Sequence, residues 1–397
     1  MLLRYKVKNY KSIADELVID LTAGSIKEHQ DSLITVNKIN VLPLAAIFGA
    51  NASGKSNLLE SLVQMKREVL TSNGVFGNFY FDKQYRANPT EVEVCIYSKE
   101  LNKEIRYGFA KLGKEIVEEW MFSKTFSTTP NLEEKCIFYR QKNQKLETEV
   151  KDTKEINEIE YVASMVGVNE LILTAIGKRK NSKDLSFFGW FECLYALEFS
   201  EINVDFALYN QEFLQLLYEN EEAKNDCAKV ISKVDPAIKG FSIETELDDN
   251  MNEVYVVYSK HLDENNELIK VPFSTESCGT KKIFSMALFL IISLQLGRVF
   301  VCDELDSKLH PLLLRYIVRM FSNKETNVGG GQLIFTSHNL VCLDSSDLRR
   351  DEIWFVEKNN QKTNAFSLYD FKEESIRKDL DFGKHYLSGR FGAIPFN

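Results

Sequence analysis

One motif near the N-terminus constrains this chain more than any other feature. An apolar run from Leu42 to Phe48 ends in Gly49, a short loop leads to Gly54-Lys55-Ser56, and leucines at helical spacing follow. This order of strand, glycine-containing loop and helix is the P-loop, whose backbone N–H groups close round phosphate oxygens. On the order of one or two random chains in a hundred of this length would contain the pattern by chance. The flanking strand and helix signals favour a true phosphate site.

Each part of the motif has a chemical task. Lys55 brings a compact positive charge to the outer phosphates, Ser56 offers a hydroxyl to Mg²⁺, and the helix N-terminus adds its positive dipole end. The residues expected to bind the nucleotide are Gly49, Asn51, Ala52, Ser53, Gly54, Lys55, Ser56 and Asn57. The motif therefore predicts a nucleotide site that uses Mg²⁺.

Composition restricts the class of protein. The chain has 397 residues, more than a single hydrophobic core usually serves, and its net charge of −9 argues against coating nucleic acid through the overall field. A local basic stretch, Lys178-Arg179-Lys180 with Lys183, is either a solubilising loop or a contact for nucleic acid or a partner. Seven scattered cysteines without a C-x-x-C pair indicate reduced thiols in a cytoplasmic protein. The apolar run from 283 to 296 is too short and interrupted to span a bilayer, so no membrane contact is expected.

We expect three parts, at residues 1–154, 155–235 and 236–397. Alternating residues predict an antiparallel β lobe in the first part. Its strands cover residues 2–13, 17–21, 91–97, 105–111 and 116–125. The Lys- and Glu-rich segment from 133 to 153 fits a mobile hairpin or a surface helix. The middle part reads as a compact helical insertion that holds a partner, and strands at 241–247 and 254–260 lead back to the core.

Two residues of the first part keep two interpretations. Lys11 belongs to Asn9-Tyr10-Lys11-Ser12-Ile13, and its cation either solvates a turn or approaches the nucleotide. Gln84 stands where many transport-type ATPases place a glutamine that senses Mg²⁺ and the γ-phosphate. A solvated loop glutamine is the simpler explanation for it.

A second apolar strand, Val299 to Cys302, ends in the adjacent carboxylates Asp303 and Glu304. This is the Walker B order, in which Asp303 holds Mg²⁺ through water and Glu304 activates the attacking water as a general base. Acidic pairs also occur at surface turns. Their position after a buried run, in a chain with a P-loop, favours hydrolysis over binding alone.

Three further elements surround that strand. Ser277 and Gly279 open the long apolar helix before it, in the position of the signature loop of ABC-type ATPases, although a Ser-x-Gly turn is also an ordinary helix cap. Asp306 follows Glu304 as in a D-loop. His338 ends the strand that begins at Gln332 and is expected to contact the γ-phosphate side, where an isolated histidine would more often be structural. The order of all these elements is difficult to obtain by accident.

Over nearly its full length, the chain resembles the AbiLi/RloA-like ATPases of bacterial phage-defence systems. The resemblance rests on the segments Phe48–Asn57, Glu276–Lys282, Asp303–Pro311, Gln332–His338 and Tyr386–Pro395. The N-terminal residues 9–13 are also similar to the opening of RecF and SMC-like ATPases, where the cation contacts the nucleotide. The tail from Tyr386 to Pro395 is the most distinctive segment, because P-loop chemistry does not require it.

The resemblance implies an α/β fold of the ABC/SMC-head-like P-loop ATPase type, with ATP and Mg²⁺ as ligands. It implies a homodimer or higher homo-oligomer whose heads close on two nucleotides, with Ser277 and Gly279 facing the other chain's phosphate. It also implies a sensor that regulates a separately encoded effector, such as a Toprim-type nuclease, in defence against phage. The main alternative is a DNA-binding repair ATPase of RecF or SMC type. A self-contained nuclease is disfavoured, because Asp205, Glu212 and Glu219 are equally well explained as helix surface.

Overall fold

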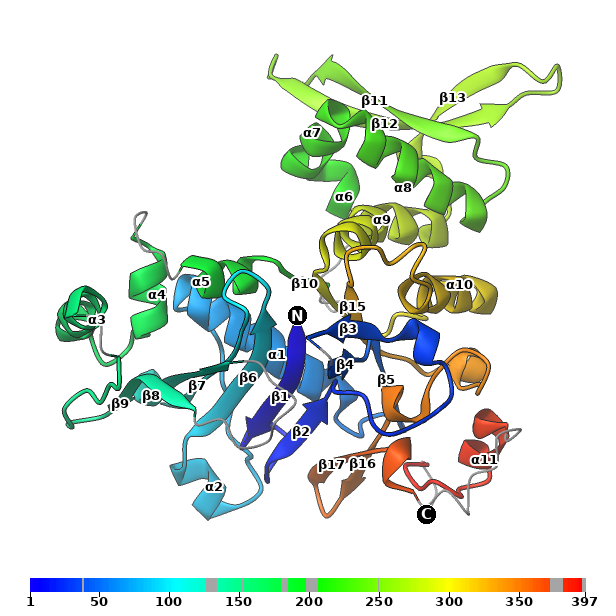
Figure 1. Cartoon of the computed structure of the whole chain (residues 1–397). Helices are drawn as coiled ribbons and strands as arrows, with labels where there is room; N and C mark the ends of the chain where they lie inside the picture. Colours follow the sequence, from blue (N-terminus) through cyan, green and yellow to red (C-terminus); the bar gives the residue numbers. More distant parts are fainter. Residues whose placement is uncertain are drawn as a thin grey trace.

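The computed structural model describes residues 1–37, 39–125, 134–150, 153–179, 185–197, 206–248, 250–371 and 381–394. Two six-stranded sheets organise the molecule (Figure 1). One forms an antiparallel lobe, and the other is a mostly parallel sheet that carries the P-loop. A smaller third sheet lies at the top of the view.

The antiparallel sheet has the strand order β2-β1-β6-β7-β8-β9. Its strands are β1 (Leu2–Lys8), β2 (Leu17–Asp20), β6 (Thr90–Ser98), β7 (Lys103–Leu112), β8 (Glu115–Thr125) and β9 (Lys135–Gln141). The first strand ends at Lys8, earlier than expected, because Asn9 and Lys11 adopt positive φ angles of 55° and 48°. Between 134 and 150, β9 joins the sheet and Tyr139 bridges Glu147, so this segment is a hairpin and the surface-helix alternative is wrong.

The core sheet has the order β10-β14-β15-β5-β16-β17. Its strands are β10 (Leu194–Leu197), β14 (Val299–Cys302), β15 (Gln332–Thr336), β5 (Leu44–Phe48), β16 (Ile353–Asn359) and β17 (Lys362–Ser367). All pairs are parallel except β16 with β17. Every residue of β5, β14 and β15 is buried, as continuous apolar runs require in a sheet covered on both faces. The carboxyl ends of these strands therefore meet at one edge.

Helices and a third sheet complete the molecule. The helices are α1 (Lys55–Thr71), α2 (Lys83–Ala87), α3 (Thr153–Met165), α4 (Ile172–Gly177), α5 (Leu185–Glu192), α6 (Phe206–Tyr209), α7 (Gln211–Glu219), α8 (Glu221–Val234), α9 (Cys278–Leu296), α10 (Pro311–Ser322) and α11 (Phe382–Leu387). The third sheet is β11 (Gly240–Leu247), β12 (Glu253–Leu262) and β13 (Leu268–Pro272), of which β13 was not predicted. A short hairpin joins β3 (Ile34–Val36) to β4 (Ile39–Val41).

The middle segment, residues 155–235, divides between two hydrophobic cores. Residues of α3, α4 and α5 pack with the antiparallel lobe and α1, whereas residues of α7 and α8 pack with α9. In addition, β10 is a strand of the core sheet inside a region predicted to be mostly helical. The boundary at 154 falls inside α3, so the three-part division stays a prediction.

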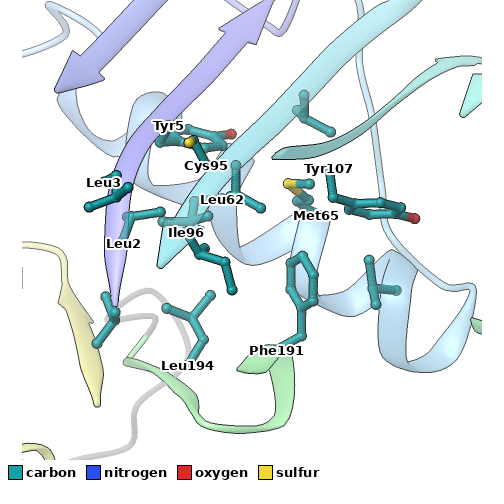
Figure 2. Close-up of a cluster of buried hydrophobic side chains, with 14 of the residues drawn as sticks. Leu2, Leu3, Tyr5, Leu62, Met65, Cys95, Ile96, Tyr107, Phe191 and Leu194 are labelled. Atoms are coloured by element: carbon teal, nitrogen blue, oxygen red, sulfur yellow. The ribbon is translucent and has the colours of Figure 1, made fainter. Parts of the chain in front are cut away.

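The first core fills the space between β1, β6, β7, α1 and α5 (Figure 2). Figure 2 shows Leu62 and Met65 of α1 directed toward Tyr5, Tyr107 and Phe191. Tyr107 contacts Phe191 edge to face, with ring centroids 6.0 Å apart. This packing fixes α1, and with it the P-loop, against the antiparallel lobe.

The helix α9 is apolar along most of its length. It is the one helix among the described residues that is long and apolar enough to cross a bilayer, with a mean hydropathy of 1.3. The helix extends the expected apolar run from 283 to 296 by one turn, because it begins at Cys278. Two-thirds of the segment is nevertheless buried inside the protein, against α8 and β14. Core packing accounts for its composition.

Candidate nucleotide site

The loop between β5 and α1 has the backbone of a phosphate-binding turn. Gly49, Ala52 and Gly54 have positive φ angles of 157°, 61° and 109°, so the loop takes up backbone conformations that are rare outside tight turns at three of its positions. A Cβ at Gly54 would lie 2.1 Å from Thr363 Oγ1, and its φ is one that other residues rarely adopt. Glycine is therefore required at Gly54 by both space and backbone. Asn51 and Ala52 are exposed at the open side of the loop.

The side chain of Lys55 extends back across the P-loop, toward its first residues. Its ammonium donates to the carbonyl oxygens of Gly49 at 2.8 Å and Ala50 at 2.9 Å. The side chain is buried, which lowers its pKa, and the nearby carboxylates of Asp303, Glu304 and Asp306 act in the opposite direction. The structure thus brings the P-loop lysine together with three acidic residues more than 240 positions away in the sequence.

A layer of hydroxyl groups supports the P-loop from behind. Thr363 of β17 donates to the carbonyl of Ser53 at 2.8 Å and contacts Ser12 Oγ at 2.8 Å. Asn57, expected to bind nucleotide, donates its amide to the same Ser12 hydroxyl at 2.6 Å. Asn57 therefore ties α1 to the segment after β1. Ser56 is exposed at the first turn of the helix, where its hydroxyl is accessible to a ligand.

One hydroxyl holds the two acidic residues after β14, through the carboxylate of Asp303 and the backbone N–H of Glu304. Thr336, fully buried at the end of β15, donates to Asp303 Oδ1 and accepts the N–H of Glu304 at 2.7 Å. Glu304 is exposed and has a φ of 46°, a left-handed conformation that is unusual for this residue and typical of functional turns. Thr336 thus fixes the loop that directs Glu304 into the open.

The next acidic residue connects this loop with His338. Both carboxylate oxygens of Asp306 accept the backbone N–H of His338, at 3.2 and 3.3 Å. The His338 side chain is exposed at the tip of β15, as expected for a residue that meets a ligand. Parallel pairing of β14, β15 and β5 therefore collects Lys55, Asp303, Glu304, Asp306 and His338 at one edge, where open α/β sheets bind ligands.

The segment expected to be a signature loop opens α9. Ser277 is the N-cap, and its hydroxyl accepts the N–H of Thr280 at 3.1 Å. A Cβ at Gly279 would lie 2.9 Å from the carbonyl oxygen of Lys308, so glycine allows this helix end to touch the loop after Asp306. Cys278 is exposed beside them. Glu276, one residue earlier, contacts His261 Nε2 of β12 at 2.7 Å.

Two residues with open interpretations lie apart from these contacts. The Lys11 ammonium pairs with the carboxylate of Glu60 on α1, and its backbone N–H donates to Gly77. Gln84 is exposed on α2, where its N–H caps onto Asp82 at 2.7 Å. Of the basic stretch, Lys178 pairs with Glu170 at 3.1 Å and Arg179 covers the Tyr161 ring. Lys180 and Lys183 lie outside the described residues, as do Asp205 and Pro395.

Sequence reasoning missed four residues that shape the site, namely Ser12, Lys282, Thr336 and Thr363. Each acts through a partner distant in the sequence, so no local motif contains the pair. For Thr336 a local signal was available, since this hydroxyl residue ends the expected strand from Gln332, two residues before His338. The distinctive tail begins in the last turn of α11 and continues into a turn in which Ala393 N–H donates to Glu357 Oε2 at 3.2 Å. It therefore packs onto β16 beside the P-loop strand.

A family model matches residues 44–344, from the P-loop strand to the segment after His338. Its description reads "AAA domain, putative AbiEii toxin, Type IV TA system", and its short name is AAA_21. The match covers more than half of the chain. This chain belongs to the AAA_21 family. The resemblance to AbiLi/RloA-like ATPases is thereby confirmed at the level of the family.

Solved structures similar to this chain include SMC heads. An SMC head bound to the C-winged helix domain of ScpA is similar with a TM-score of 0.53 and 14% identity, covering 94% of this chain and 99% of that chain. The SMC head domain from Thermotoga maritima gives 0.41 and 15% identity over 92% and 98%. A Pyrococcus yayanosii Smc head with coiled coil and joint gives 0.46 and 12% over 98% and 99%. None of the curated proteins compared with this AAA_21 chain matched it. The first similarity confirms the α/β SMC-head fold.

The residues present fit a triphosphate with Mg²⁺. Ser53 Oγ, in the middle of the P-loop, is buried without a hydrogen-bond partner, and the Lys55 ammonium donates to the carbonyl oxygens of Gly49 and Ala50. Both groups would gain from an anion, because unpaired buried donors are costly. The hydroxyl of Ser56 and the carboxylate of Asp303 are oxygen ligands of the kind that Mg²⁺ takes. Among the described residues there is no separate cluster of three or more metal-binding side chains.

Proposed function

We propose that this AAA_21 chain binds and hydrolyses ATP, and that the resulting change of shape regulates a partner effector. The observation that carries the proposal is the convergence of Lys55 with Asp303, Glu304 and Asp306 at the carboxyl edge of the core sheet. One basic and several acidic groups at the mouth of a P-loop are the parts that phosphoryl transfer to water requires.

Each residue then has a defined task. The loop from Gly49 to Asn57 holds the phosphates, with Lys55 at the outer ones. Ser56 and, through water, Asp303 would hold Mg²⁺, which would neutralise charge on the phosphate oxygens. Glu304 accepts the proton of the attacking water, for which its exposure and outward direction are suitable. His338 contacts the γ-phosphate side, and Lys11 stays a candidate nucleotide contact.

Two chains are proposed to close head to tail on two nucleotides. In this arrangement Ser277 and Gly279 of one chain, at the positive end of α9, approach the γ-phosphate held by the other chain, and Asp306 lies at the contact. The exposure of Glu304, His338 and Cys278 supports this assignment, because residues for such a contact must be accessible in the single chain. Hydrolysis would then reopen the dimer.

The change of shape is proposed to regulate a separately encoded effector with nuclease or toxin activity, as part of anti-phage defence. The family description, which names a toxin–antitoxin system, supports this setting. The similar SMC head was solved with a domain of another protein, ScpA, which supports the expectation that this fold docks a partner chain. We expect a cytoplasmic protein that uses no membrane contact.

The proposal is tested with purified chain by following phosphate release and molecular mass together. We expect Mg²⁺-dependent ATP hydrolysis that Lys55→Ala abolishes through loss of nucleotide binding. Glu304→Gln should bind ATP, hydrolyse it at least about 100-fold more slowly, and elute as a dimer only with ATP. A Glu304→Gln protein that hydrolyses ATP at the wild-type rate would refute the general-base assignment, and one that remains monomeric with ATP would refute the dimer.

A further inference from the structure

Lys282 occupies an unusual position in the second turn of α9. Its side chain is only 4% exposed. The ammonium donates to three backbone carbonyl oxygens of a single loop, at 3.2 Å to Glu304, 3.2 Å to Leu305 and 2.6 Å to Ser307. A buried ammonium loses its hydration shell, and this cost is offset only if well-placed hydrogen-bond acceptors take the place of water. Burial accordingly lowers its pKa, while the charges of Asp306 and Glu304 offset part of that effect.

The loop that Lys282 contacts is strained. Glu304 and Lys308, at its two ends, have positive φ angles of 46° and 60°. Non-glycine residues in this conformation are retained where surrounding contacts hold them. Three convergent carbonyls on one ammonium are such contacts, so the direction of the Glu304 side chain depends on Lys282.

A second contact joins the same two elements. The Cα of Gly279 lies so close to the loop that a Cβ there would be 2.9 Å from the Lys308 carbonyl oxygen. Lys282 and Gly279 therefore attach the N-terminal turns of α9 to residues 303–308 at both ends. The signature loop and the loop with Glu304 are thus joined at two points within one chain.

This inference rests on the proposed head-to-tail dimer, in which Ser277 meets the partner's nucleotide and Glu304 acts on the nucleotide of its own chain. We propose that Lys282 is a positioning residue. When the signature loop of a chain contacts the nucleotide held by the partner chain, Lys282 aligns the Glu304 of the chain to which it belongs. The two sites of the dimer are thereby coupled, since ATP bound by one chain places the general base of the other.

The test replaces Lys282 by Met, which keeps the length of the side chain and removes the ammonium. Lys66→Met is the matched control, because Lys66 is half-buried, donates to a single carbonyl, that of Leu194, and has a pKa lowered by burial. Lys282→Arg is a second variant that retains the charge. Its planar guanidinium cannot present one nitrogen to three carbonyls in the same way, so we expect a folded protein of intermediate rate.

Three measurements are made on each variant, namely nucleotide binding, steady-state ATPase kinetics and hydrogen exchange. For Lys282→Met we expect ATP affinity within about twofold of wild type, kcat lower by roughly 10- to 100-fold, and a Hill coefficient for ATP that falls from above 1 to about 1. Hydrogen exchange should accelerate at the amides of Leu305, which donates to the Thr336 carbonyl, and of Ser307 and Leu309, which donate to carbonyls of this loop. It should stay unchanged in α1. Lys66→Met should keep wild-type values in all three.

The outcomes separate this inference from the proposed function. A wild-type chain that does not hydrolyse ATP, or a Glu304→Gln chain that does not dimerise, overturns the proposed function and the coupling with it. If wild type does both, a Lys282→Met protein with wild-type kcat and Hill coefficient overturns the inference alone. The same holds if Lys66→Met reproduces the losses, or if exchange at residues 303–308 is unchanged in Lys282→Met.

Discussion

The hydroxyl of Thr336 provides the sharpest test of how the site is built. Thr336→Val keeps the shape of the side chain and removes both the bond to Asp303 and the acceptor for the Glu304 N–H. Because Glu304 is exposed, its backbone N–H can bond to water in the variant. The free energy lost is therefore mainly that of the hydrogen bond to the Asp303 carboxylate. A hydrogen bond to a charged group contributes about 1.5–3 kcal/mol.

If that free energy is expressed entirely in the transition state, kcat falls by roughly 10- to 100-fold, since about 1.4 kcal/mol corresponds to tenfold. ATP affinity should remain close to wild type, because the P-loop contacts are untouched. The Mg²⁺ concentration for half-maximal rate should rise, since Asp303 is no longer oriented. Steady-state phosphate release over a Mg²⁺ titration measures both effects, and fluorescence of a labelled nucleotide measures binding.

Two controls make the result specific. Thr336→Ser keeps the hydroxyl and should remain within about twofold of wild type in kcat. Thr174→Val removes another fully buried hydroxyl, bonded to the Val69 carbonyl at 2.7 Å, far from the carboxylates in the sequence, and should cost stability without changing the Mg²⁺ dependence. Wild-type kcat and Mg²⁺ dependence in Thr336→Val, or equal losses in Thr336→Ser, would refute the reasoning.

Two further predictions concern a thiol and a buried carboxyl. Cys278 alone of the seven cysteines is exposed, so its modification by N-ethylmaleimide should block the ATP-dependent dimerisation of the Glu304→Gln protein. A protein that also carries Cys278→Ser should still dimerise after the same treatment. Persistence of the dimer after complete labelling of Cys278 would exclude Ser277 from the contact. Burial raises the pKa of Glu352 from 4.5 to about 8, so the stability it contributes is present below pH 4.5 and is lost as pH rises through about 8. Glu352→Gln should flatten that decline in urea midpoints measured across the range, and an unchanged slope would contradict the assignment.

The motifs at the site could be read from the sequence because each is contiguous. Gly54-Lys55-Ser56 and Asp303-Glu304 carry their backbone requirements and their chemistry in adjacent residues, and the buried strands before them are plain apolar runs. The same logic recovered β6, β7 and β8, whose alternation is regular. The order of the motifs, together with the family resemblance that they carry, predicted the α/β head fold, which the SMC-head similarity confirms.

Other elements lack such a signal. The hairpin of β16 and β17 turns at Asn360 and Gln361, which have φ angles of 50° and 67° without a glycine to mark them. Yet Thr363 of this hairpin supports the P-loop. In the middle segment, periodicity indicates that a helix has an apolar face but not which core receives it, so one helical region was expected where two cores divide the helices. Lys282 could not be assigned, since its acceptors depend on tertiary contact.

The charges of this chain bear on the remaining alternative, a DNA-binding repair ATPase. Lys178 is already paired with Glu170, and the Arg179 guanidinium lies 5.0 Å from the centre of the Tyr161 ring. A net charge of −9 adds repulsion from a polyanion. We therefore expect double-stranded DNA to raise the ATPase rate by less than about twofold at low salt. An ATPase rate that DNA raises severalfold, with an effect that declines steeply between low and physiological salt, would instead require phosphate contacts by a basic surface. DNA would then replace the effector as the proposed partner of the ATPase cycle.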